Sequence, residues 1–248
     1  MADPMHQFQI QPIVPFHIGG VDLSFTNSSL WMMIATGACM LLLGLASSQK
    51  SLVPSRLQLI GEDLYGFVEN LITDNIGGKG REYFPLVFTL FMFVIMGNMM
   101  GMIPYSFTYT SHLAVTASLA MLVFLTVLVM GIARHGFHFL SLFVPHGVPG
   151  WLIWLVVLIE VVSFISRPIT LSVRLFANMV AGHVLIKVIA GFAIMFASVG
   201  GVAWIATLLP AAFNIVMIGF EIFIAFIQAY VFAVLTCIYL KDTVEIEH

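Results

Sequence analysis

Long apolar runs occupy most of the chain and predict helices that cross a membrane. A helix rises about 1.5 Å per residue, so roughly 20 apolar residues span a hydrocarbon core about 30 Å thick. Prolines, glycines and charged residues separate five such runs. They cover residues 30–46, 84–103, 112–133, 151–192 and 209–240. We therefore predict an all-α integral membrane protein with about five transmembrane helices.

The last two runs are too long to stand upright in a bilayer. A helix of about forty residues measures about 60 Å, twice the thickness of the hydrocarbon core. Each of the two helices must therefore tilt strongly or bend, and Pro168 and Pro210 mark places where bending costs little. We expect them to pack as a hairpin that buries polar side chains at mid-membrane depth.

Residues 54–76 show a different pattern, in which apolar residues recur at helical spacing with acidic residues between them. This pattern is typical of an amphipathic helix lying along the membrane surface. Residues 1–28 contain three prolines but no Lys or Arg, and they predict an irregular tail on the outer side of the membrane. Residues 29–248 then form a single membrane domain.

Composition and charge support these elements. The chain is 60% hydrophobic and 8% charged, whereas a soluble domain carries about 25% charged residues. No basic cluster points to nucleic acid. Outside the fourth span, every Lys and Arg falls on the side of the C-terminus, namely Lys50, Arg56, Lys79, Arg81, Arg134 and Lys241. The positive-inside rule then places the N-terminus outside and the C-terminus in the cytoplasm or matrix.

The fourth span carries five ionisable residues, which are Glu160, Arg167, Arg174, His183 and Lys187. A charge at the centre of a bilayer costs at least about 2.5–3.5 kcal/mol, so such groups face protein or water and are functional candidates. Arg174 lies deep in the span. Its permanently charged guanidinium can attract and release carboxylates but cannot shuttle protons.

The spacing of the polar residues sorts them into stripes. A separation of seven places Glu160, Arg167 and Arg174 on one side of the helix, and Asn178 extends this stripe. His183 lies about 180° away, with Lys187 one turn beyond it. On the last span, a separation of seven again aligns three polar residues, which are Asn214, Glu221 and Gln228. The sequence therefore predicts polar stripes with candidate functional residues on both long helices.

Simpler interpretations stand beside this one. Glu160 and Arg167 could orient their helix, and Lys187 could extend to the outer surface. Asn214 and Gln228 could be interhelical hydrogen-bond partners. His183 could be a satisfied core histidine, although Glu221 on a neighbouring helix favours a proton relay.

The sequence gives little support for a metal or cofactor site. Three histidines, His135, His138 and His146, lie in one loop without Cys or acidic co-ligands, and we interpret them as interface residues. His183 is the only histidine in mid-span, which argues against a haem cytochrome. The sequence contains no phosphate loop, nucleophile elbow or zinc-protease motif, so we predict a non-catalytic chain with no cofactor or metal.

The polar stretch of the fourth span resembles a known family. Residues 166–183 read SRPITLSVRLFANMVAGH, which is similar to the signature of subunit a of F-type ATP synthases. Residues 227–232 (IQAYVF) and 97–105 (GNMMGMIPY) fit the same family, in its alphaproteobacterial and mitochondrial form. Many bacterial members carry Glu at the position of His183 and His at that of Glu221, so the pair is exchanged here. Residues 108–112 lack the acidic residues that some bacterial members have.

The resemblance implies a proton-conducting stator beside a rotating ring of c subunits, with b-type subunits of the peripheral stalk and the remaining synthase subunits as partners. It implies two offset half-channels that carry protons to and from the ring carboxylates. Arg174 would separate the half-channels, and Asn178, Glu221 and Gln228 would line them. Nucleotide chemistry would belong to other subunits. The expected location is a bacterial inner membrane or, alternatively, the mitochondrial inner membrane.

Two alternatives remain. A proton-coupled secondary transporter would also bury ionisable groups, but transporters usually contain internal repeats, and the stretch around Arg174 occurs once. A membrane anchor subunit of a respiratory complex would not need a buried charge such as Arg174.

Overall fold

The computed structural model describes residues 8–18, 21–22, 24–48, 54–103, 106–136, 139, 149–200 and 203–244. Within these ranges the chain is predominantly helical, which confirms the predicted fold class. Five helices in the described part are long and apolar enough to cross a membrane. These are Asn27–Ser48, Gly78–Gly101, Leu113–His135, Ile153–Val199 and Trp204–Lys241.

Seven α-helices and two short 3-10 helices follow one another in the described part. They are α1 (Asn27–Ser48), α2 (Arg56–Ile76), η2 (Gly78–Tyr83), α3 (Phe84–Gly101), η3 (Tyr109–Ser111), α4 (Leu113–His135), α5 (Ile153–Val199), α6 (Ala203–Ala206) and α7 (Leu208–Val244). Local signals set several boundaries. Ser55 caps α2 by accepting a hydrogen bond from the backbone N–H of Gln58 at 3.3 Å. Gly77 and Gly200 follow α2 and α5 with positive φ angles of 84° and 74°.

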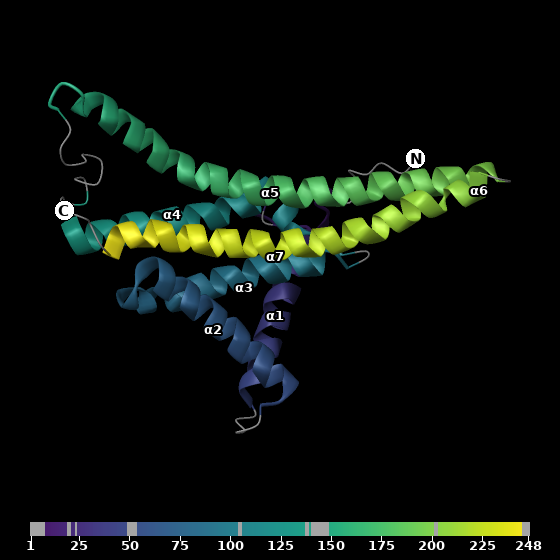
Figure 1. Cartoon of the computed structure of the whole chain (residues 1–248), viewed down its shortest axis with the longest axis horizontal. Helices are drawn as coiled ribbons and strands as arrows, with labels where there is room; N and C mark the ends of the chain where they lie inside the picture. Colours follow the sequence, from purple (N-terminus) through teal and green to yellow (C-terminus); the bar gives the residue numbers. More distant parts are fainter. Residues whose placement is uncertain are drawn as a thin grey trace.

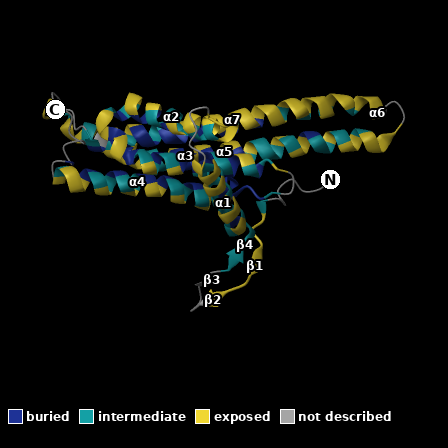
Figure 2. Cartoon of the chain, turned by 90° about the horizontal axis from the view of Figure 1, so that it is seen from below, coloured by how far each residue is buried: buried dark blue, intermediate teal, exposed yellow. Residues whose placement is uncertain are grey.

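The sequence predicted an irregular N-terminal tail, but part of this tail forms short β-strands. Strand β1 (Pro12–Val14) pairs antiparallel with β4 (Phe25–Thr26), and β2 (His17–Ile18) pairs with β3 (Val21–Asp22). Figure 2 shows these strands beyond one end of α1. Strands of two or three residues are too short to produce a recognisable alternation of polar and apolar residues, which explains the wrong prediction.

Helices α5 and α7 form the predicted hairpin. Figure 1 shows them side by side along the long axis of the molecule, meeting at α6, with α3 and α4 packed along α7. Their 47 and 37 residues correspond to about 70 and 55 Å. Both helices therefore exceed the thickness of a hydrocarbon core. Pro168 lies inside α5, whose first part curves away from α7 in Figure 1.

The core lies where α3, α4, α5 and α7 overlap, and the α6 end of the hairpin projects beyond it (Figure 2). Phe91, Leu175 and Phe232 are fully buried in this core. Near the α6 end, by contrast, Leu209 is 79% exposed and Ile215 is 73% exposed. That half of the hairpin thus presents apolar side chains to lipid or to another subunit.

Helix α2 is amphipathic, as predicted. Its buried residues are Val68, Leu71, Ile72 and Ile76, and the helix packs against α1, α3 and α7. Its position at the membrane surface stays a prediction.

Polar contacts join the end of α7 to its neighbours. The hydroxyls of Tyr83 and Thr243 lie 3.1 Å apart, and Nε2 of His135 donates to the Thr243 carbonyl at 2.9 Å. Arg134 pairs with Glu82 and covers the Tyr83 ring. His135 therefore joins the end of α4 to the end of α7. His138 and His146 lie outside the described residues.

Candidate functional site

The hairpin brings together polar residues that lie far apart in the sequence. The side-chain amide of Asn178 on α5 donates a 2.8 Å hydrogen bond to Oε1 of Gln228 on α7. Gln228 is 2% exposed. Its Nε2 atom is buried with no hydrogen-bond partner among the described residues. The antiparallel course of α5 and α7 explains how residues fifty positions apart form this pair.

A second pair lies farther toward the α6 end of the hairpin. Nδ1 of His183 is 3.4 Å from Oε1 of Glu221, and the two side chains are 12% and 5% exposed. Because both residues can take up and release a proton, the contact is suited to a proton relay. Its role stays a prediction.

Gly182 makes room for Glu221 beside His183. A Cβ atom at Gly182 would lie 2.7 Å from Oε1 of Glu221 and 3.1 Å from its carboxyl carbon, which is closer than side chains pack. The missing side chain at Gly182 thus allows the carboxylate to rest against α5.

Thr108 completes this cluster, and sequence reasoning missed it. Its hydroxyl lies 3.0 Å from Nε2 of His183, so the imidazole is contacted on both nitrogens. In the sequence, residues 108–112 are notable only because they lack acidic groups. A hydroxyl in a connecting segment carries no periodic signal, and only the return of this segment to α5 reveals its partner.

Asn98 on α3 is a further buried polar residue. In the sequence it stands out only as part of the motif at residues 97–105. It is fully buried, and its side-chain amide donates to the Ala225 carbonyl of α7 at 3.3 Å. Its Oδ1 has no hydrogen-bond partner among the described atoms. Asn98 therefore adds an acceptor to the interior face of α7, between the levels of Glu221 and Gln228.

Arg174 lies apart from the polar pairs between α5 and α7. It lies near the middle of α5 and is exposed. No hydrogen bond or ion pair joins it to another described residue. Val173 beside it and Ile169 one turn earlier are exposed apolar residues. Ala177 and Ala181, which are also exposed, lie one and two turns farther along. A permanent cation thus stands on an outward apolar face.

Arg167 provides the contrast. Its guanidinium lies 3.9 Å from the carboxylate of Glu160 and covers the rings of Phe164 and Tyr239, at 5.5 and 5.1 Å from their centroids. This arrangement is compensated within the chain and fits a role in holding α5 against α7.

The remaining two candidates are not joined to these pairs. Lys187 is exposed on α5. Asn214 is half-buried on α7, and its Oδ1 lacks a hydrogen-bond partner among the described atoms.

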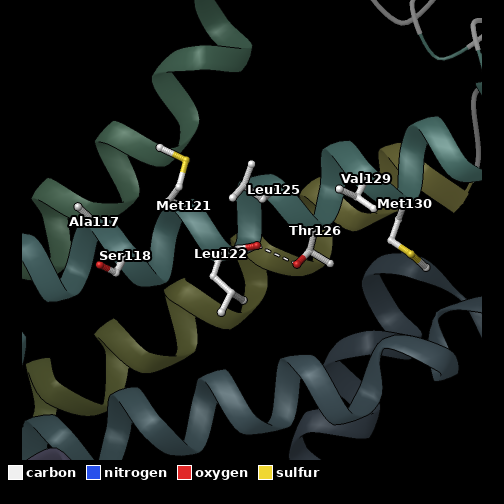
Figure 3. A pocket seen from close by; sticks show the side chains of 8 residues that line it. All are labelled: Ala117, Ser118, Met121, Leu122, Leu125, Thr126, Val129 and Met130. Atoms are coloured by element: carbon white, nitrogen blue, oxygen red, sulfur yellow. Dashed lines mark hydrogen bonds between the residues drawn. The ribbon is translucent and has the colours of Figure 1, made fainter.

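One hollow outside the hairpin lacks ionisable groups. A groove of about 800 Å³ runs along the outward face of α4 (Figure 3), and its lining contains no ionisable side chain. It is lined by Ala117, Ser118, Met121, Leu122, Leu125, Thr126, Val129 and Met130. In the described ranges, no three His, Cys, Asp or Glu residues are arranged to hold a metal ion.

Comparison with known proteins shows the family of the chain. The sequence model of a family described as "ATP synthase A chain" matches residues 29–241. The chain is 54% identical over 247 residues to "ATP synthase subunit a" of Chelativorans sp. (strain BNC1), covering 100% of this chain and 99% of the relative. It is 52% identical to the protein of that name from Rhizobium etli (strain CIAT 652), covering 98% and 97%. For Rhodospirillum rubrum the identity is 51%, covering 98% and 99%. The chain therefore belongs to the ATP synthase A chain family.

Proposed function

We propose that this chain is the proton-translocating stator subunit of an F-type ATP synthase. The observation that carries the proposal is Arg174, an exposed cation on an apolar face of α5 that has no ion pair among the described residues. In a membrane such a cation needs a counter-charge from outside the chain. An ionised carboxylate on a neighbouring, moving ring of c subunits supplies one. The chain itself breaks no bond of ATP.

The mechanism follows from the difference between the two protonation states of a ring carboxylate. When ionised, the carboxylate is attracted to the fixed guanidinium; when protonated, it loses this attraction and can move into lipid. Arg174 stays charged throughout, so it neither carries protons nor lets one pass directly across. Protons that reach the ring on one side of Arg174 must therefore leave on the other side after the ring has turned.

Buried polar groups on α3, α5 and α7 support two proton paths. We assign His183 and Glu221 to the outer half-channel. Asn178, Gln228 and Asn214 line the half-channels beside them. Several of their atoms, such as Gln228 Nε2 and Asn214 Oδ1, are buried without hydrogen-bond partners in the described ranges. Such atoms are where ordered water binds, and water next to these groups would extend each path. Glu160 and Arg167 support the inner side of the hairpin, and Lys187 marks its outer side.

The same proposal assigns a location and partners. The chain lies in a bacterial inner membrane with its N-terminus outside and its C-terminus in the cytoplasm, because the positive charges outside α5 lie on the side of the C-terminus. Its partners are the c-subunit ring, which covers the Arg174 face, the b-type subunits of the peripheral stalk, the remaining synthase subunits and lipid. The mitochondrial inner membrane is the alternative location.

Co-purification tests the proposal against a secondary transporter or an anchor subunit. The tagged chain, extracted in mild detergent, is expected to bring down a small multi-copy membrane subunit and the ATP-hydrolysing subunits. Vesicles containing this complex should acidify on addition of ATP. A chain that purifies alone and exchanges protons with a solute by itself would contradict the proposal.

Gly182→Ala is expected to lower ATP-driven proton pumping several-fold while the complex still assembles. The new methyl group meets the flexible end of Glu221 at 2.7 Å, so the carboxylate can move away and lose its contact with His183. Gly191→Ala is the matched control, because a Cβ atom there meets nothing within 4 Å. Acidification of vesicles, normalised to assembled complex, measures both. Equal loss in the two variants would show a general effect on the helix.

A further inference from the structure

The Thr108 hydroxyl stands between a ring nitrogen of His183 and a backbone carbonyl. It lies 3.0 Å from Nε2 of His183 and 3.1 Å from the carbonyl oxygen of Gly101. Gly101 ends α3, where carbonyl groups lack partners inside the helix. Its oxygen also accepts a 2.9 Å hydrogen bond from the Ser106 hydroxyl. A threonine hydroxyl carries one hydrogen, so Thr108 can donate to only one of its two neighbours at a time.

This constraint gives Thr108, His183 and Glu221 two complementary arrangements. Oε1 of Glu221 has no hydrogen-bond partner among the described atoms and lies 3.4 Å from Nδ1 of His183, so a small approach of the two side chains completes either arrangement. In the first, Thr108 donates to Nε2 of His183, the ring carries its hydrogen on Nδ1, and Nδ1–H donates to an ionised Glu221. In the second, Thr108 donates to Gly101 and accepts from Nε2–H, while the bare Nδ1 accepts a hydrogen bond from a protonated Glu221. The second arrangement holds one proton more than the first.

A proton balance connects the two arrangements. A proton arriving from the outer side bonds to Nε2 as the Thr108 hydrogen turns to Gly101. The Nδ1–H bond then breaks as an O–H bond forms on Glu221. One proton enters at Nε2, one leaves from Nδ1, and the imidazole is neutral before and after.

We propose that Thr108 is a positioning residue that sets the tautomer of His183 according to whether Glu221 holds a proton. The proposal rests on the proposed function, since it describes how the outer half-channel hands a proton to Glu221. It assigns this role to a buried residue of the segment that connects α3 and α4.

The segment around Thr108 is held firmly enough to do this. A Cβ atom on Gly101 would lie 2.4 Å from the Thr108 hydroxyl, so the absence of a side chain at Gly101 permits the contact. The Ser111 hydroxyl donates to the Thr108 carbonyl at 2.6 Å, and the Tyr109 hydroxyl donates to the Phe93 carbonyl at 2.9 Å. Thr108 itself is buried. Within Thr108, the hydroxyl hydrogen is the one atom that changes position between the two arrangements.

Few titratable groups surround the imidazole. Glu221 faces it from α7, Lys187 follows one turn along α5, and the segment carrying Thr108 also contains Tyr109 and His112. His112 is stacked on Phe107 with 5.0 Å between ring centroids, and burial lowers its pKa. The ring of Phe8 meets His183 edge-on at 6.4 Å. Among these groups, Glu221 is the one whose carboxyl reaches a nitrogen of His183.

Nitrogen NMR of the assembled complex in lipid vesicles tests the proposal. With ¹⁵N-labelled histidine and a His183→Gln complex for assignment, the two ring nitrogens report which one is protonated. Wild type is expected to show the Nδ1–H form at alkaline pH and the Nε2–H form at acidic pH. Thr108→Val should lose the Nε2–H form, because a buried N–H without an acceptor is costly, and pumping should fall about tenfold.

Two matched variants complete the experiment. Thr108→Ser keeps the hydroxyl and is expected to retain both tautomers and most of the pumping. Thr110→Val removes a buried hydroxyl of the same segment that has no hydrogen-bond partner among the described atoms, and should behave as wild type. A single tautomer of wild-type His183 at all pH values, or an unchanged pair of tautomers in Thr108→Val, would overturn the proposal. The NMR readout does not depend on pumping, so a failure of the proposed function would be recognised separately.

Discussion

Arg174→Ala is expected to abolish ATP-driven proton pumping while passive proton leakage persists or rises. Arg174 is an exposed cation on an apolar face of α5, and the ring carboxylates are its proposed counter-charges. Without the guanidinium, nothing holds an ionised carboxylate at the interface or separates the two half-channels. Protons could then cross without turning the ring. Vesicles carrying assembled wild-type or variant complexes measure both quantities, by acidification with ATP and by collapse of an imposed pH difference.

Two comparison variants sharpen this experiment. Arg134→Ala removes the same charge from the end of α4, where it pairs with Glu82, and pumping per assembled complex should be preserved. Arg174→Lys keeps the charge but loses the planar guanidinium that can bind a carboxylate through two donors. We therefore expect it to block leakage better than alanine while still impairing pumping. Undiminished pumping by Arg174→Ala would make this residue structural and remove the basis of the proposed mechanism.

Glu221→Gln is expected to lower both ATP-driven pumping and passive proton conductance, by about a hundredfold or more if the side chain is an obligatory proton carrier. Glutamine has the shape of glutamate and fits the buried position against His183, but it cannot take up and release a proton. The loss should therefore occur without loss of assembly. The combined fall in pumping and leakage distinguishes this variant from Arg174→Ala, in which only pumping is lost.

Glu62→Gln provides the matched control for this change. Glu62 is an exposed residue of α2, and its carboxylate accepts a 2.8 Å hydrogen bond from Gln58. Removing its charge should leave both proton measurements at the wild-type level. Normal passive conductance in Glu221→Gln would mean that protons reach the ring by a route that bypasses the His183–Glu221 pair.

The structure also distinguishes residues that the sequence cannot tell apart. Arg167 and Arg174 look alike in the sequence, each an arginine in the same apolar span, seven residues apart. Arg167 is compensated by Glu160 and two aromatic rings, whereas Arg174 is exposed and has no ion pair among the described residues. The difference comes from where α7 lies relative to α5, and spacing along one helix cannot reveal that.

Only the tertiary structure shows that both polar faces of α5 contact α7. Helical spacing separates Asn178 from His183, yet both reach α7, through Gln228 and Glu221. Two long antiparallel helices that curve along each other can meet on slightly different faces at successive levels. Register and curvature set these meetings, and neither is encoded in the period of one segment.

Sequence alone determined the membrane class, the five spans, the amphipathic α2 and the two helices too long to stand upright. These properties depend on local hydrophobicity and on the fixed rise of a helix, which need no knowledge of the fold. Sequence also supplied the candidate residues, since charge is too costly in lipid to occur there without cause. Only the tertiary structure decided which of them meet. The pairing across α5 and α7, the arrival of Thr108 at His183 and the isolation of Arg174 depend on contacts between distant segments, and packing sets those contacts.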